Sequence, residues 1–108
     1  MSFDLTGRVA LVTGAGNGIG KAIALGLAQH GADLLICDVD DAGLAGTAEE
    51  ATALGRKATT FHADIEDKAS IAALFDRLDA EFGRIDILVN NVGTGARFYP
   101  EDLPVEDF

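Results

Sequence analysis

The chain has 108 residues, of which 48% are hydrophobic and 24% are charged, as expected for one soluble globular domain. Its net charge of −10 argues against nucleic acid and against an anionic membrane surface as partners. The single cysteine, Cys37, cannot form a disulfide within the chain, which favours a cytoplasmic location. No apolar run reaches the length of a membrane span, and the first residues do not resemble a secretion signal.

Short apolar runs alternate with longer segments of helical spacing. Unbroken apolar runs are typical of parallel strands that are covered on both faces. The predicted strands are Arg8–Gly14, Asp33–Val39, the weaker Lys57–Ala63, and Ile85–Asn91.

The segments between these strands carry apolar residues at helical spacing. The first has Ile19, Ile23 and Leu27; the second a weaker set, Leu44, Ala48, Ala51 and Leu54; the third Ile71, Leu74, Phe75, Leu78 and Phe82. This β-α-β-α-β-α-β order predicts the α/β class: a Rossmann-type doubly wound parallel sheet, of which the chain would hold the N-terminal portion, incomplete.

Residues at the predicted helix ends agree with this order. A glycine follows each helical segment, at the position where a left-handed backbone ends a helix: Gly31, Gly55 and Gly83. Asp67 precedes the third helical segment and suits the N-cap position.

The stretch from Val12 to Gly20, VTGAGNGIG, places glycines between the first strand and the first helix. Gly14 can make the tight turn out of the strand, and Gly18 has no Cβ to keep a pyrophosphate from the helix N-terminus. Gly20 allows the helix to pack close to the sheet. A flexible turn is the alternative interpretation, but the flanking strand and helix favour a phosphate site.

These residues resemble the short-chain dehydrogenase/reductase family over essentially the whole chain. The resemblance rests on four motifs in order: the T-G-x-x-x-G-x-G pattern of Thr13–Gly20, Asp38 ending the second strand, Asp64 after the third, and Asp86–Gly93, DILVNNVG. The family usually has N-N-A-G where this chain has Asn90-Asn91-Val92-Gly93. The cofactor-binding residues that the resemblance implies are Gly14, Asn17, Gly18, Ile19, Gly20, Asp38, Asp64, Ile65, Asn91 and Gly93.

The position of Asp38 favours NAD over NADP. An acid at the end of the second strand accepts hydrogen bonds from the adenosine ribose and repels a 2′-phosphate. Relatives that prefer NADP carry a basic residue where this chain has Asn17 or Val39. By resemblance, Asp64 meets the adenine amino group with Ile65 beside the ring, and Asn91 lies along the ribose. A solvated strand-end acid at Asp38, a loop acid at Asp64 and a purely structural role for Asn90 and Asn91 remain the alternatives.

The family's catalytic residues are a serine and a Tyr-x-x-x-Lys pair, and no such set occurs in this sequence. The single tyrosine, Tyr99, has Leu103 four places on, and the serines are Ser2 and Ser70, neither placed for catalysis. We therefore assign no catalytic residue. We also assign no metal site, because His30 and His62 lack partners at ligand spacing.

The resemblance implies that residues 1–93 form an NAD-binding Rossmann half and that residues 94–108 form a loop leading to a missing C-terminal half. The parent protein would be an NAD-dependent oxidoreductase that transfers hydride between nicotinamide and an alcohol or carbonyl substrate, and a homo-oligomer. The alternative is a non-catalytic nucleotide-binding or interaction fragment. The 108-residue chain alone is expected to be inactive.

Overall fold

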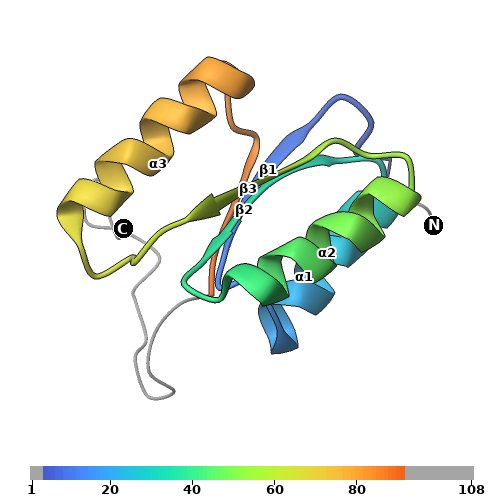
Figure 1. The fold of residues 1–108 in the computed structure, drawn as a ribbon. Coiled ribbons are helices and arrows are strands. Elements are labelled where there is room, and N and C mark those ends of the chain that lie inside the picture. The colour runs from blue at the N-terminus through green and yellow to red at the C-terminus, as the bar shows by residue number, and fades with distance from the viewer. Residues whose placement is uncertain (1–3, 92–108) are drawn as a thin grey trace.

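The structure, a computed structural model, describes residues 4–91 (Figure 1). Strands and helices alternate along the chain. They are β1 (Val9–Thr13), α1 (Gly18–Gln29), β2 (Asp33–Asp38), α2 (Asp41–Ala53), β3 (Ala58–His62), α3 (Lys68–Glu81) and β4 (Ile87–Asn90). The predicted β-α-β-α-β-α-β order is confirmed, and each observed strand lies within its predicted run.

The four strands form one parallel sheet in the order β3-β2-β1-β4. In register, Leu11 of β1 lies between Leu35 of β2 and Leu88 of β4. The chain therefore starts in the interior of the sheet, moves outward to β3 and crosses back to β4. This is the strand order of a doubly wound fold, and it confirms the predicted class.

Helices cover both faces of the sheet: α1 and α2 lie on one face and α3 on the other (Figure 1). Successive side chains of a strand point to opposite faces, so each interior strand serves both layers. The strand residues buried on the α1–α2 side are Ala10, Val12, Leu34 and Ile36, and those on the α3 side are Val9, Leu11, Leu35 and Cys37.

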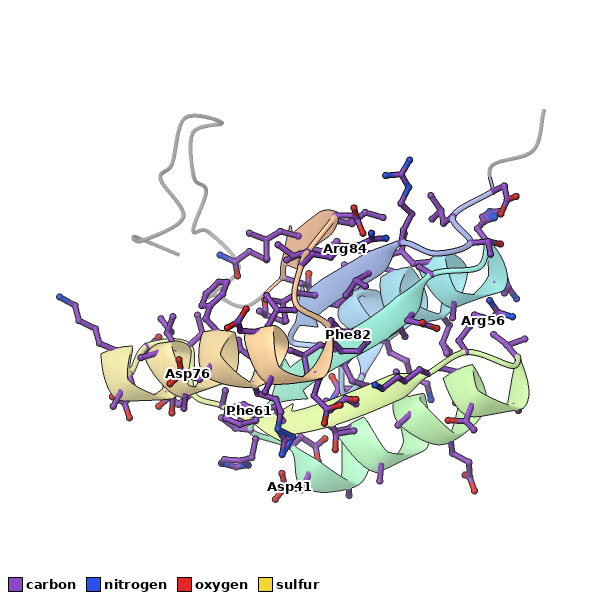
Figure 2. All side chains as sticks on the ribbon, turned by 90° about the horizontal axis from the view of Figure 1, so that it is seen from above. Asp41, Arg56, Phe61, Asp76, Phe82 and Arg84 are labelled. Atoms are coloured by element: carbon purple, nitrogen blue, oxygen red, sulfur yellow. The ribbon has the colours of Figure 1, made fainter. Side chains whose placement is uncertain are left out.

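Aromatic side chains complete the α3 layer. Leu74 and Leu78 of α3 are buried against the sheet, and Phe61, Phe75 and Phe82 pack around them. Phe61 on β3 and Phe82 at the end of α3 are seen at this side of the sheet in Figure 2. The strong apolar stripe predicted for the third helix is confirmed.

Two features of burial differ from the sequence prediction. The apolar runs predicted strands covered on both faces, but this holds for β1 and β2 alone; the outer strands β3 and β4 are partly exposed, Leu88 by 38%. In α1, the side chains spaced four apart, Ile19 among them at 71% exposed, do not form the most buried face. That face consists of small residues: Gly20, Ala24 and Ala28.

The predicted helix ends are confirmed. The glycines that follow the three helices have positive φ angles, 110° at Gly31, 87° at Gly55 and 74° at Gly83. The Asp67 carboxylate accepts a hydrogen bond from the Ala69 amide at 3.1 Å and so caps α3.

Candidate functional site

The predicted binding residues within the described range gather at one edge of the sheet. Because the strands are parallel, their carboxyl ends meet there. The glycine-rich loop follows β1, Asp38 ends β2, Asp64 and Ile65 follow β3, and Asn91 follows β4. Gly93, also predicted from the sequence, lies outside the described residues.

The glycine-rich loop uses the conformational freedom of glycine at two positions. Gly14 and Gly18 have φ angles of 65° and 61°, in the left-handed region that favours glycine. A Cβ on Gly18 would meet no atom within 4 Å, so the space beside the start of α1 is open. The Ala15 amide donates to the Cys37 carbonyl at 3.2 Å, which ties the loop to β2.

The N-terminus of α1 differs from those of the other helices. Asp40 and Asp67 cap α2 and α3 with their side chains, whereas Asn17 makes no side-chain hydrogen bond to the α1 amides. The side-chain nitrogen of Asn17 (Nδ2) instead donates a hydrogen bond to the Asp40 carboxylate at 3.1 Å. No acidic residue lies in the first turn of α1. The first amides of α1, with the positive end of the helix dipole, can therefore bind an anion.

Asp38 is held by backbone amides on both of its carboxylate oxygens. Oδ2 accepts from the Gly16 amide at 2.9 Å, and Oδ1 accepts from the amides of Val39 at 2.7 Å and Asp40 at 3.2 Å. The side chain is partly exposed. Each carboxylate oxygen has two lone pairs, so Oδ1 is fully used and Oδ2 retains one acceptor position for a ligand.

A hollow of about 120 Å³ lies at the ends of β2 and β3. It brings together Asp38, Asp64 and Ile65, which the sequence placed in one site. Val39, which the sequence analysis used to judge cofactor preference, also lines it, as do two residues that sequence reasoning missed, Ala63 and Glu66. Each is adjacent in sequence to a predicted residue, and this neighbourhood was the available signal. The Asp64 carboxylate accepts from the Glu66 amide at 3.0 Å, which fixes the turn after β3.

Thr13 fastens the end of β4 to β1. Its hydroxyl contacts the Asn90 side-chain oxygen at 3.0 Å and accepts from the Asn91 amide at 2.9 Å. The Asn91 side-chain nitrogen lies 3.5 Å from the Gly14 carbonyl oxygen. Asn91 is thus placed directly beside the glycine-rich loop.

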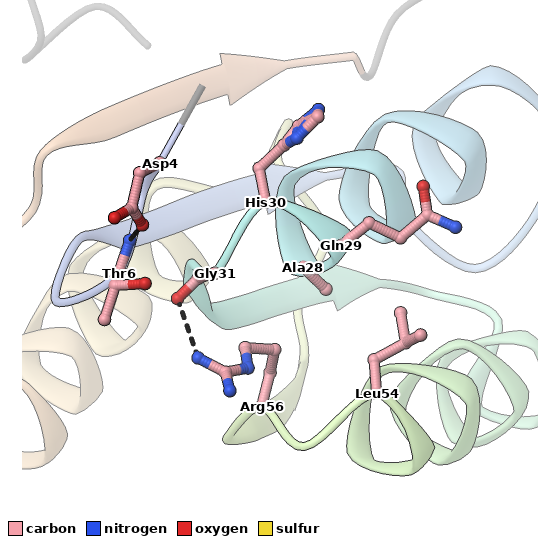
Figure 3. A pocket seen from close by; sticks show the side chains of 8 residues that line it. All are labelled: Asp4, Thr6, Ala28, Gln29, His30, Gly31, Leu54 and Arg56. Atoms are coloured by element: carbon pink, nitrogen blue, oxygen red, sulfur yellow. Dashed lines mark hydrogen bonds between the residues drawn. The ribbon is translucent and has the colours of Figure 1, made fainter. Parts of the chain in front are cut away.

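A larger hollow, about 310 Å³, lies at the opposite edge of the sheet (Figure 3). Arg56 crosses it and donates to the Gly31 carbonyl at 3.1 Å, and Asp4 accepts from the Thr6 amide at 2.9 Å. This hollow is remote from the glycine-rich loop. Ligands of open parallel sheets bind at the carboxyl ends of the strands, which favours the smaller hollow as part of a binding site.

The two histidines and the cysteine considered in the sequence lie at the surface, at a helix end and in the core. His62 lies 2.8 Å from the Asp41 carboxylate at the surface, and His30 is the C-cap of α1. Cys37 is fully buried, and this burial, with the neighbouring Asp38 charge, raises the pKa of its thiol to about 12. Residues 4–91 contain no cluster of three metal-ligating side chains. Within the same range, no helix has both the length and the apolar character needed to cross a membrane.

A parallel sheet with a glycine-rich loop after its first strand and an acid ending its second defines the Rossmann class of nucleotide-binding proteins. The family model of the short chain dehydrogenases matches residues 8–108, and the chain belongs to this family of oxidoreductases. It covers the cofactor-binding N-terminal region of the fold.

Relatives with known names agree with this assignment. The 2-dehydro-3-deoxy-D-gluconate 5-dehydrogenase of Escherichia coli (strain K12) is 48% identical over 92 residues, which are 85% of this chain and 36% of the relative. The chain thus spans about a third of the length of this relative.

Two solved structures share the fold and differ in the cofactor that their titles name. The Pseudomonas aeruginosa RhlG/NADP active-site complex has a TM-score of 0.78 and 42% identity, over 85% of this chain and 37% of that one. A short chain dehydrogenase/reductase from Burkholderia phymatum, in complex with NAD, has a TM-score of 0.75 and 36% identity, over 80% of this chain and 31% of that one. The family therefore uses NAD or NADP.

Proposed function

We propose that this chain is the NAD-binding portion of a short-chain oxidoreductase that transfers hydride between nicotinamide and an alcohol or carbonyl substrate. The observation that carries the proposal is the position of Asp38. Its carboxylate is fixed at the end of β2, beside the glycine-rich loop and at the rim of a hollow that also contains Asp64 and Ile65.

The start of α1 would hold the pyrophosphate of the dinucleotide. Its first amides have no capping side chain, its first turn contains no acidic residue, and the open space beside Gly18 leaves room for phosphate oxygens. Gly14 would contribute the turn, while Asn17 and the exposed Ile19 would flank the bound phosphates. Gly20 would act by allowing α1 to approach β1.

The adenosine would lie across the ends of β1, β2 and β3. Asp38 would accept a hydrogen bond from a ribose hydroxyl through Oδ2, Asp64 would meet the adenine amino group, and Ile65 would lie beside the ring. Asn91, close to the Gly14 carbonyl, would lie along the ribose. When bound, the cofactor supplies the nicotinamide that donates or accepts the hydride.

Charge at the end of β2 supports NAD as the preferred cofactor. Asp38 and Asp40 place two carboxylates there. A basic side chain at position 17 or 39 would bind a 2′-phosphate, but these positions are occupied by the uncharged Asn17 and Val39. Juxtaposed like charges cost several kcal/mol in binding. A 2′-phosphate would therefore be disfavoured.

A second candidate is nucleotide binding without catalysis. It is favoured by the sequence around Tyr99, which lacks a lysine four places on, at Leu103. Without a positioned acid or base, the proton-transfer contribution of roughly 10²–10⁴ in rate is lost. We expect NADH absorbance assays of the 108-residue chain with a panel of alcohols to show no turnover. Turnover by the pure chain would overturn that expectation and would mean that residues other than a serine and a Tyr-x-x-x-Lys pair supply the proton transfer.

Calorimetric titration of the full chain with NAD⁺ and NADP⁺ tests the proposal. We expect tighter binding of NAD⁺, and we expect Asp38→Ala to weaken NAD⁺ and narrow the gap between the two cofactors. Asp33→Ala is a matched control, because Asp33 is at the other end of β2, where its carboxylate accepts from the Lys57 amide at 2.9 Å. Tighter binding of NADP⁺, or an Asp38→Ala variant that behaves like Asp33→Ala, would contradict the proposal.

A further inference from the structure

Thr47 of α2 is a fully buried polar residue outside the sequence motifs of the family resemblance. Its hydroxyl lies 2.8 Å from the Ala15 carbonyl oxygen and 3.1 Å from the Gly43 carbonyl oxygen. The second contact is the common back-bond of a helical threonine. The first is shorter and reaches 32 residues back along the chain, into the glycine-rich loop.

Helix α2 presses its N-terminal half against this loop. Gly43 lies one turn before Thr47, on the same helix face, and a Cβ on Gly43 would come within 2.5 Å of the Gly16 carbonyl oxygen. Two successive carbonyls of the loop, those of Ala15 and Gly16, therefore face α2. Only a residue without a Cβ at position 43 allows the Thr47 hydroxyl to approach so closely.

One peptide group joins Thr47 to Asp38. The carbonyl of Ala15 and the amide of Gly16 belong to the same planar unit, and in a trans peptide they point in opposite directions. Thr47 holds the carbonyl, and the Asp38 carboxylate accepts from the amide at 2.9 Å. Rotation of this plane at one end must therefore move the hydrogen bond at the other.

We propose that Thr47 is a positioning residue for cofactor selection, acting on Asp38 through this peptide group. The proposal rests on the proposed function, because it takes Asp38 to be the group that meets the ribose. Thr47 is fully buried, so it would act without contacting the cofactor itself. It holds the carboxylate in the orientation in which a ribose hydroxyl is accepted and a 2′-phosphate is refused.

Replacing Thr47 by valine removes the hydroxyl and nearly keeps the shape. The Ala15 carbonyl then loses its partner in a buried position, and the peptide group turns to find another. We expect the dissociation constant for NAD⁺ to rise roughly ten-fold, the scale set by one unpaired buried polar group. The constant for NADP⁺ should stay the same or fall, because the amides of α1 are not part of this connection and a displaced Asp38 carboxylate repels the 2′-phosphate less.

The variants Thr47→Val, Thr47→Ser and Thr52→Val are compared by titration with both cofactors. Serine keeps the hydroxyl and should restore the NAD⁺ preference. Thr52 lies on the exposed side of α2 and serves as the matched control. In the ¹H–¹⁵N spectrum, the Gly16 amide should shift in Thr47→Val and return in Thr47→Ser.

A double-mutant cycle identifies the route of the effect. If Thr47 acts through Asp38, the double variant Thr47→Val/Asp38→Ala should have the same ratio of NAD⁺ to NADP⁺ affinity as Asp38→Ala alone. An equal loss of both cofactors in Thr47→Val, or an unchanged ratio, overturns this inference and leaves the proposed function standing. A wild-type chain that binds neither cofactor, or that prefers NADP⁺, overturns both.

Should Thr47→Val fail to fold by circular dichroism, Asp38→Asn probes the same connection from its other end. The Thr47 methyl resonance should then move together with the Gly16 amide. A Thr47 methyl resonance that stays in place overturns the inference.

Discussion

Gly20 and Gly14 lie so close together that a Cβ on Gly20 would stand 1.9 Å from the Gly14 carbonyl oxygen. This contact joins the first turn of α1 to the end of β1. No side chain at position 20 is compatible with the observed approach of helix and strand. We expect Gly20→Ala to lower the free energy of unfolding by about 1–3 kcal/mol, or more if the helix cannot shift. Urea denaturation followed by circular dichroism measures this change.

Gly26 provides the control on the same helix. A Cβ there would meet no atom within 4 Å, and alanine favours a helix interior over glycine by about 1 kcal/mol. Gly26→Ala should therefore stabilise the chain or leave it unchanged. If Gly20→Ala is tolerated as well as Gly26→Ala, the close approach of α1 to β1 is not what the protein requires at position 20.

Replacing Gly18 by alanine should have two separate effects, backbone strain and obstruction of the ligand. Its φ of 61° disfavours any other residue, and alanine there should cost about 1–2 kcal/mol of stability. Because the added methyl would enter the open space beside α1, we also expect dinucleotide affinity to fall at least ten-fold, as expected for the loss of about 1.4 kcal/mol of binding energy. Equilibrium unfolding and cofactor titration measure the two effects separately.

Gly55 is the control: it has a similar backbone conformation but lies far from the proposed binding site. Its φ is 87°, a Cβ on it would meet no atom within 4 Å, and it follows α2 at the opposite edge of the sheet. Gly55→Ala should lower stability by a similar amount and leave affinity unchanged. Equal loss of affinity in both variants would mean that Gly18 affects binding only through stability.

Local signals explain why so much of this fold could be predicted from the sequence. The glycines after each helix and the cap at Asp67 depend on a few neighbouring residues, and the structure places all of them as predicted. The expectation of a common site came from the family resemblance, and the structure gives its physical reason: parallel strands end at the same edge. Asp38 and Asp64 meet at one hollow for that reason.

Contacts between distant segments could not be predicted in the same way. Thr47 interrupts the weak apolar stripe of α2 and gave no signal, because its burial depends on a loop 32 residues earlier. Leu88 belongs to an apolar run and yet is 38% exposed, because β4 is an outer strand of this sheet. The sequence of a strand does not determine whether the strand is central or outer. The small residues of α1 are buried because the helix lies too close to the sheet for larger ones.

Asp86 ties the start of β4 to the start of β1 and makes stability depend on acid pH. Its carboxylate accepts from the Val9 amide at 2.8 Å and lies 3.6 Å from Arg8 and 3.2 Å from Arg84. The Val9 hydrogen bond, reinforced by the two arginines and opposed by partial burial, lowers the pKa of Asp86. A lowered native pKa stabilises the fold above the unfolded pKa of about 4, and this contribution is lost as the pH falls through the native value.

We therefore expect Asp86→Ala to be less stable than the wild type at pH 7, with the difference shrinking below about pH 4. Denaturant midpoints at several pH values measure the difference. Asp79→Ala, at an exposed position of α3, is the control for losing one negative charge. A difference between wild type and Asp86→Ala that stays constant down to pH 2 would show that the charge of Asp86 plays no part.

Cys37 should make the fold sensitive to alkaline pH while remaining unreactive at neutral pH. Its thiol is fully buried on β2, and its pKa is raised to about 12, mainly by burial and also by the Asp38 charge, against the opposing effect of the Gly14 amide. At pH 8 a thiol with such a pKa is ionised in about one molecule in ten thousand, and the thiolate is the reactive form. Thiol reagents should label the native chain far more slowly than the chain in urea.

The same raised pKa has a consequence for stability. The native state keeps its proton where the unfolded state loses it, so the wild type should lose stability as the pH rises above about 9, by roughly 1.4 kcal/mol per pH unit. Cys37→Ala removes this dependence and keeps all other titrating groups, so the difference between the two unfolding free energies isolates the thiol. Denaturant unfolding between pH 8 and about 10.5 measures it. Parallel pH profiles for the two proteins, or equal labelling rates in the native and unfolded chains, would mean that Cys37 is accessible to solvent in the native fold.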